Sequence, residues 1–202
     1  MGAIKLTGSS SGSTTITAPA TGGDETIELS TALAAKADTA SLVPGGLVYI
    51  TSGTANAASS ISVNGCFTAT YSDYRIVASL TTSTNADIRL RLRGSGTDNS
   101  SAVYDYADQY FTAAASGLEG GTAAAYLSLA FGLTGLASGA WDILGPAATY
   151  LTTTLGMAKE GNNNTKIHGG RMTVTTAYDG FTLYPGSGTF SGTVAVYGYR
   201  KA

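Results

Sequence analysis

The residues most suited to chemistry in this 202-residue chain are three arginines that alternate with apolar residues. In DIRLRLRGSG, Arg89, Arg91 and Arg93 fall on one face of a strand, because the side chains of a strand alternate between its two faces. Such a stripe can bind a polyanion, form a subunit or capsid interface, contact another ligand, or simply be the solvated face of a half-buried strand. The chain has a net charge of −2 and only 11 basic residues, so we predict a solvated or ion-paired face and no binding of nucleic acid. The nearest acidic residues that could pair with the arginines are Asp73, Asp87 and Asp98.

A second group of polar and aromatic residues lies in YDYADQYF, a stretch that fits neither a clear strand nor a clear turn. Aromatic faces stack on sugar rings and carboxylates accept hydroxyl protons, so these residues could form a sugar-binding patch. The plainer interpretation is a long solvated loop with part-buried tyrosines. The residues that we consider for contact with a receptor are Tyr104, Asp105, Tyr106, Asp108 and Tyr110, with the loop at 162–165.

Signatures of catalysis and of metal binding are nearly absent. The sequence has no phosphate-binding loop, zinc-protease helix, nucleophile elbow or acidic calcium loop. His168 is the only histidine, so a Ser–His–Asp set would have to use it, and a histidine-rich metal site within one chain is excluded. We expect His168 to be a loop or interface histidine, with ligand contact or a place on a trimer axis as the alternatives. The single cysteine, Cys66, allows no intrachain disulfide, and we expect a buried thiol, no enzyme, no metal and no cofactor.

The composition predicts that these residues are carried by β-strands. Only 12% of the residues are charged, and the polarity comes from Ser, Thr, Asn and 27 Gly, with 12 Tyr. Such a composition suits pleated, half-buried surfaces joined by turns. Short runs of period two follow one another from residue 47, and we predict an antiparallel β-sandwich or jelly roll over residues 45–202. The expected strands are 47–52, 60–64, 67–71, 73–81, 87–93, 124–131, 148–155, 171–178, 180–184 and 189–199.

Residues 1–44 form a separate piece in this interpretation. AIKL, TTIT and TIEL are strand-like but too short to bury a core alone, so this arm must pair with the domain, with sister chains or with a larger particle. Residues 30–43 are expected to form one short Ala-rich linker helix that ends at Pro44. We predict neither a secretory signal nor a membrane span, because no sufficiently long apolar run occurs. The arm residues expected to make the attachment contacts are Ile4, Leu6, Ile16, Ile27, Leu29 and Leu33.

Three stretches resemble surface proteins of bacteriophage virions. GSSSGSTTITAPATGGDETIELS is similar to the Ser/Thr/Gly-rich opening segment of many such proteins. GLVYITSG, with the following F-x-x-x-Y-x-x-Y-R-I, resembles the start of a β module of phage tail fibres, and SGTFSGTVAVYGY resembles its closing strand. Residues 95–170 match only loosely, through Trp141 and the turn after it. The matching positions are Gly46, Leu47, Val48, Phe67, Tyr71, Tyr74, Arg75, Ile76, Ser187, Gly188, Gly192, Val196, Tyr197 and Gly198.

This resemblance implies a non-enzymatic, homotrimeric β-sandwich protein of the virion, assembled in the cytoplasm of a bacterial host. The expected function is a surface fibre, anchored to other virion proteins by the arm, whose β domain contacts the host surface, for example a glycan. A capsid decoration protein that clamps neighbouring capsomers is the first alternative. A free carbohydrate-binding module is the second, although a lectin would not need the strand-rich arm.

Overall fold

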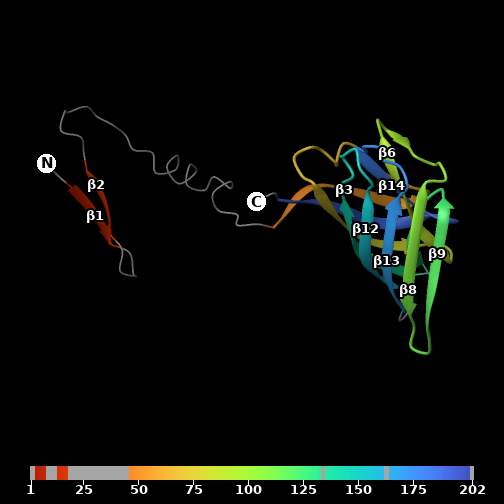
Figure 1. Cartoon of the computed structure of the whole chain (residues 1–202). Coiled ribbons are helices and arrows are strands. Elements are labelled where there is room, and N and C mark those ends of the chain that lie inside the picture. Colours follow the sequence, from red (N-terminus) through yellow and green to blue (C-terminus); the bar gives the residue numbers. More distant parts are fainter. Residues whose placement is uncertain (1–2, 8–12, 18–45, 133–134, 162–163, 201–202) are drawn as a thin grey trace. The chain divides into compact units, whose positions relative to one another are not determined.

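The chain divides into two compact units, Met1–Pro44 and Gly45–Ala202, in the computed structural model shown in Figure 1. The structure describes residues 3–7, 13–17, 46–132, 135–161 and 164–200. In the first unit, β1 (Ala3–Thr7) and β2 (Ser13–Thr17) form an antiparallel hairpin in which the backbone of Ile4 lies opposite that of Ile16. The third strand-like run, the linker helix predicted over 30–43, and Ile27, Leu29 and Leu33 lie outside the described residues.

The second unit consists of two antiparallel sheets. The larger sheet has the strand order β3-β15-β5-β11-β12-β13-β8-β9, and the smaller has the order β10-β6-β14-β4, with β7 paired to β6. The large-sheet strands are β3 (Leu47–Ala58), β5 (Asp73–Thr82), β8 (Tyr104–Phe111), β9 (Ser116–Ala124), β11 (Gly135–Leu144), β12 (Thr153–Glu160), β13 (Asn164–Met172) and β15 (Phe190–Tyr199). The small-sheet strands are β4 (Ile61–Val63), β6 (Ala86–Gly94), β7 (Thr97–Asp98), β10 (Leu127–Gly132) and β14 (Gly180–Pro185).

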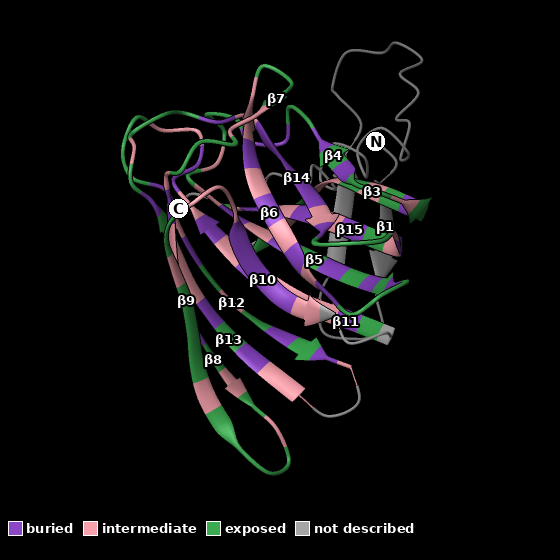
Figure 2. Ribbon diagram, turned by 90° about the vertical axis from the view of Figure 1, so that its right-hand side faces the viewer, coloured by how far each residue is buried: buried purple, intermediate pink, exposed green. Residues whose placement is uncertain are grey.

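The two sheets share one hydrophobic core. Along β6 and β5 the buried and less buried positions alternate, which Figure 2 shows as bands on the ribbon. Ile88, Leu90 and Leu92 of β6 are buried, as the alternation predicted, and they meet large-sheet residues such as Ile76 and Trp141 in the same core cluster. The prediction of an all-β, antiparallel protein is therefore confirmed, and the described residues contain no helix.

Several element predictions were wrong in detail. The unplaced stretch YDYADQYF is not a long loop but strand β8. β9 and β11 were not predicted, while 67–71 and most of 171–178 are not strands. The Tyr74 hydroxyl group explains one of these errors: it accepts a hydrogen bond from the Thr68 amide at 2.6 Å and donates one to the Thr68 carbonyl at 2.7 Å, which holds that backbone in a loop.

Some of the residues that carry the resemblance have packing roles. Phe67 packs against Tyr74 with the ring centroids 4.8 Å apart, and both are buried. Gly192 in the closing strand has φ +134°, and a Cβ atom there would lie 2.1 Å from the Ser79 carbonyl oxygen. That position therefore requires glycine, because strand β15 lies too close to β5 for any side chain.

Candidate functional site

A cluster of polar and charged side chains lies buried between the two sheets. Asp108 comes from β8, Lys166 and His168 from β13, and Thr154 from β12. β13 pairs with both β8 and β12, and His168 lies directly opposite Asp108 in the register. Lys166 and His168 are each 1% exposed and Asp108 is 2% exposed. Charged groups are almost never buried to this extent unless they are paired, so their partners determine what the cluster can do.

The Asp108 carboxylate is the centre of the cluster. Its Oδ2 atom lies 2.8 Å from the Lys166 Nζ atom, and its Oδ1 atom lies 2.7 Å from Nδ1 of His168. On the other side of the imidazole, Nε2 lies 2.8 Å from the Thr154 hydroxyl oxygen. An ionised carboxylate can only accept hydrogen bonds, so Nδ1 of His168 carries a proton and donates it to Asp108. In the neutral imidazole, Nε2 then accepts the Thr154 hydroxyl proton.

Further polar groups surround the Lys166 ammonium group. Its Nζ atom lies 3.3 Å from the Ser128 hydroxyl oxygen and 3.4 Å from Oε2 of Glu119. Burial disfavours the charged form of Lys166, but Asp108, with Glu119 and Glu160, outweighs this effect and raises the pKa of Lys166. Glu160 is itself buried and accepts a hydrogen bond from the Phe131 amide, and burial raises its pKa. The cluster thus holds a buried ammonium group among carboxyl groups, of which that of Glu119 is half exposed.

The order hydroxyl, imidazole, carboxylate is that of a hydrolase triad, with Thr154 in the place of a serine. Thr154 is 0% exposed, however, so the carbonyl group of an external substrate cannot reach its hydroxyl group in this conformation. The prediction of a loop or interface position for His168 was wrong: it is a core residue in the middle of β13. Among the described residues there is no cluster of three His, Cys, Asp or Glu side chains suited to hold a metal ion.

The structure separates the residues considered for receptor contact. Tyr104 and Asp108 are buried, so they cannot contact a receptor in the folded domain, and this part of the prediction was wrong. The Tyr104 hydroxyl group instead donates to the Asn99 carbonyl at 2.7 Å. Tyr110 is part-buried near the far end of the strand, and Asn164 and Thr165 of the expected loop at 162–165 belong to β13. Tyr104, Asp105, Tyr106, Asp108 and Tyr110 all belong to β8.

Asp105 and Tyr106 do lie together, at an open hollow of about 440 Å³ on the large sheet. Arg171 of β13 also lines this hollow, and its Nη2 atom lies 3.1 Å from Oδ2 of Asp105. A hydrogen bond from the Ala123 amide, together with Arg171, lowers the pKa of Asp105, so this carboxylate stays ionised. A carboxylate and a guanidinium group beside this hollow are suited to hydrogen-bond a polar ligand such as a sugar, while the Tyr106 ring packs on the opposite face of β8, with its centroid 6.5 Å from that of Tyr126.

The three arginines of β6 are engaged within the small sheet. Arg89 is paired with Asp87 at 3.2 Å and lies over the Tyr126 ring, with Cζ 4.2 Å from its centroid. Arg91 donates to the Ala125 carbonyl at 3.0 Å and lies over the Tyr184 ring.

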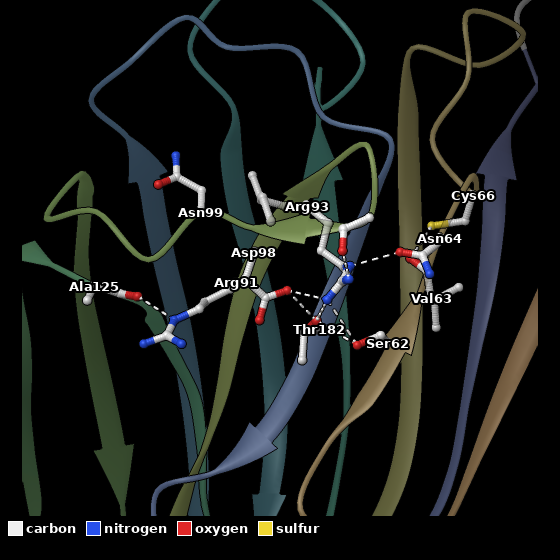
Figure 3. Close-up of polar contacts among 12 residues, drawn as sticks. Ser62, Val63, Asn64, Cys66, Arg91, Arg93, Asp98, Asn99, Ala125 and Thr182 are labelled. Carbon is white, nitrogen blue, oxygen red and sulfur yellow. Dashed lines mark hydrogen bonds and ion pairs between the residues drawn. The ribbon is translucent and has the colours of Figure 1, made fainter.

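Arg93 has the largest set of partners, which Figure 3 shows. It is ion-paired with Asp98 and donates to the Thr182 hydroxyl oxygen at 2.7 Å and to the Asn64 side-chain carbonyl at 2.8 Å. The predicted ion-paired face is therefore present, with Asp87 and Asp98 as partners. The third predicted partner, Asp73, instead accepts a hydrogen bond from the Gly145 amide.

The outer face of the large sheet carries exposed apolar side chains, which the sequence did not single out. Val77, Met157 and Ile167 are 40%, 57% and 43% exposed. They lie in one row across β5, β11, β12 and β13, with Ala140 between Val77 and Met157. Leu155, 52% exposed, belongs to the adjoining row. Contiguous exposed apolar surface on a folded domain is typical of an interaction site.

Comparison with known proteins gives no further assignment: no family model, no curated protein and no solved structure matches the chain significantly. In the described part of the chain, no helix has the length and apolar character needed to span a membrane.

Proposed function

We propose that the chain is a non-enzymatic structural protein of a bacteriophage virion, a homotrimeric surface fibre with a jelly-roll-like β domain. Residues 1–44, with their linker helix, anchor the fibre to other virion proteins, and residues 45–202 project toward the host surface. The resemblance of the opening segment and of the closing strand to phage virion proteins supports the assignment to a virion. The division of the chain at residue 44 is compatible with an anchor and a projecting domain.

The observation that carries the trimer is the apolar row on the outer face of the large sheet. Burial of apolar surface stabilises association by about 25 cal/mol per Å². Val77, Met157 and Ile167 lie in register in one row, with Ala140 of β11 between Val77 and Met157, so one flat partner surface could cover all of them. An open hollow of about 320 Å³, lined in part by Leu118, Leu155 and Ile167, adjoins the row and could receive a side chain of the partner.

The hollow beside Tyr106 is the candidate surface for host contact. Its Asp105–Arg171 pair supplies a hydrogen-bond acceptor and a donor beside the hollow, and these are groups that can bind the hydroxyl groups of a saccharide. The capsid decoration alternative uses the same trimer, and the two differ in the number of copies on the particle. Tens of copies or fewer indicate a tail fibre, and hundreds indicate capsid decoration.

The assignment of the anchor is tested by removing residues 1–44. The shortened chain should fold, because residues 45–202 hold the whole of the two-sheet core, and it should fail to join particles during assembly. The control is the full chain with Lys5→Ala, which keeps the arm. Incorporation of the shortened chain at the normal level would refute the anchor assignment.

A further inference from the structure

Lys166 and Asp108 combine an amine and a carboxyl group in contact within the interior of a β domain. The Nζ atom of Lys166 lies 2.8 Å from Oδ2 of Asp108, and the side chains are 1% and 0% exposed. The two residues lie on paired strands, β13 and β8, so the sheet itself holds the groups together. The carboxyl carbon, Cγ of Asp108, is one covalent bond beyond Oδ2. Reacting groups fixed at such distances gain effective concentrations of about 10⁵–10⁸ M over free groups in water.

We propose that Lys166 and Asp108 condense to an isopeptide bond that cross-links β13 to β8 inside the folded domain. The Nζ–Cγ bond forms, the Cγ–Oδ2 bond breaks, and Oδ2 leaves as water. Starting from the ion pair, both protons of that water come from the ammonium group, and the amide nitrogen keeps the third. The reaction needs no oxidant, nucleotide or metal, and it removes two buried charges, each of which is costly in the interior.

The first step is transfer of a proton from Nζ to Asp108, which produces a neutral amine and a neutral acid. Burial disfavours the charged form of Lys166 and so brings this neutral pair closer in free energy to the ion pair than it is in water. Before condensation the ion pair is the more populated form, since Asp108 raises the pKa of Lys166. The amine reacts from the less populated neutral pair.

His168 and Glu119 are placed to assist the addition step. Negative charge develops on Oδ1 when Nζ adds to Cγ, and the Nδ1–H group of His168, 2.7 Å from Oδ1, stabilises it. The Thr154 hydroxyl group, 2.8 Å from Nε2, holds the imidazole ring in this orientation. Glu119, with Oε2 3.4 Å from Nζ, can take the second proton from the nitrogen and pass it to the departing Oδ2.

The test is the mass of the full chain, purified folded and then denatured. We expect a mass below that of the sequence by one water, about 18 Da. Protease digestion should give one joined peptide pair linking residues 104–111 to 164–172 through Lys166 and Asp108. A mass equal to that of the sequence would overturn the proposal. A loss of one water with the two peptides still separate would also overturn it, because dehydration of Asp179-Gly180 to a cyclic imide lowers the mass by the same amount.

Three variants separate the roles. Asp108→Asn should still cross-link, with loss of ammonia, about 17 Da, in place of water. Lys166→Arg keeps the charge but lacks the amine nucleophile, so it should have the full sequence mass. When chain recovered unfolded and uncondensed is refolded, Glu119→Gln should form the bond at least about tenfold more slowly than the parent, because general acid–base groups contribute about 10²–10⁴-fold to such steps. An unchanged rate in Glu119→Gln would remove Glu119 from the mechanism.

Discussion

The pairing of Lys166 with Asp108 makes a strong prediction for stability. Changing Lys166→Met leaves the buried Asp108 carboxylate beside His168 but without its ammonium partner, and changing Asp108→Ala leaves the Lys166 ammonium group without its nearest carboxylate. Breaking a buried ion pair by removing one partner costs about 3–5 kcal/mol. Since a domain is stable by only about 5–15 kcal/mol, each single variant should lose a large part of its free energy of unfolding.

The double variant Lys166→Met with Asp108→Ala should be more stable than either single variant. It removes both charges together and leaves a packing defect, which we expect to cost about 2–3 kcal/mol, together with a His168 Nδ1–H group that has lost its carboxylate, a loss that Asp108→Ala shares. The order of stabilities holds whether or not the isopeptide bond forms in the parent chain, because all three variants lack it.

Denaturation with urea, followed by tryptophan fluorescence of the buried Trp141, measures these differences. Thr97→Ala on the exposed strand β7 is a matched surface control and should change stability by less than about 0.5 kcal/mol. Single losses below about 1 kcal/mol, or losses that simply add in the double variant, would show that the two buried groups do not depend on each other.

Three further predictions concern other parts of the domain. Burial raises the pKa of Glu160, so in the folded state it keeps its proton at pH values where the unfolded chain, with the ordinary pKa of 4.5, has released it. The resulting contribution to the free energy of unfolding is fully present below pH 4.5 and is lost as the pH rises through the raised pKa. Glu160→Gln should remove this part of the pH profile of stability, measured by urea denaturation. The Arg75 guanidinium group, with Nε 2.7 Å from Oδ1 of Asp142, lowers the pKa of that carboxyl group, so the pair stabilises the fold above pH 3.8 and less as the pH falls below it. Because the pair is partly exposed, Arg75→Met should lower the free energy of unfolding by less than about 1 kcal/mol at neutral pH. The variant should also show a weaker loss of stability as the pH falls below 3.8. Burial raises the pKa of the Cys66 thiol to about 12 from 9.0, which leaves roughly a thousandfold less thiolate at neutral pH, so Cys66 should resist iodoacetamide in the folded chain and react once urea unfolds it; rapid labelling of the folded chain would contradict its burial.

The sequence predicted best where strands alternate strictly and partners are close along the chain. Ile88, Leu90 and Leu92 alternate with the arginines, and their burial follows directly from period two. Asp98 is only five residues from Arg93, so their ion pair across the β6–β7 turn was within reach of local reasoning. Strand β11 was missed because four of the six residues in its first part, GLASGA, are Gly or Ala, which have low β-propensity.

The buried cluster could not be predicted in the same way. It requires β13 to pair with β8, which brings together residues 60 apart in the case of Asp108 and His168. The local pattern also misleads, because in β13 the polar Lys166 and His168 point into the core while the apolar Ile167 is exposed. That reversed alternation is the one signal in the sequence, and it becomes meaningful only when the facing strands are known.

The exposed apolar row that contains Met157 and Ile167 allows a direct test of the interface. Met157→Asp would place a charge in the centre of the apolar row, so this variant should fold normally and lose its association, while Thr97→Asp on β7 should leave association unchanged. Association that survives Met157→Asp would place the interface elsewhere.

The most direct test of the proposed assembly is the mass of the full chain in solution, measured by light scattering at micromolar concentration. We predict three copies of the 20.3-kDa chain. A stable monomer at that concentration would contradict the trimer and, with it, the proposed role of the exposed sheet face.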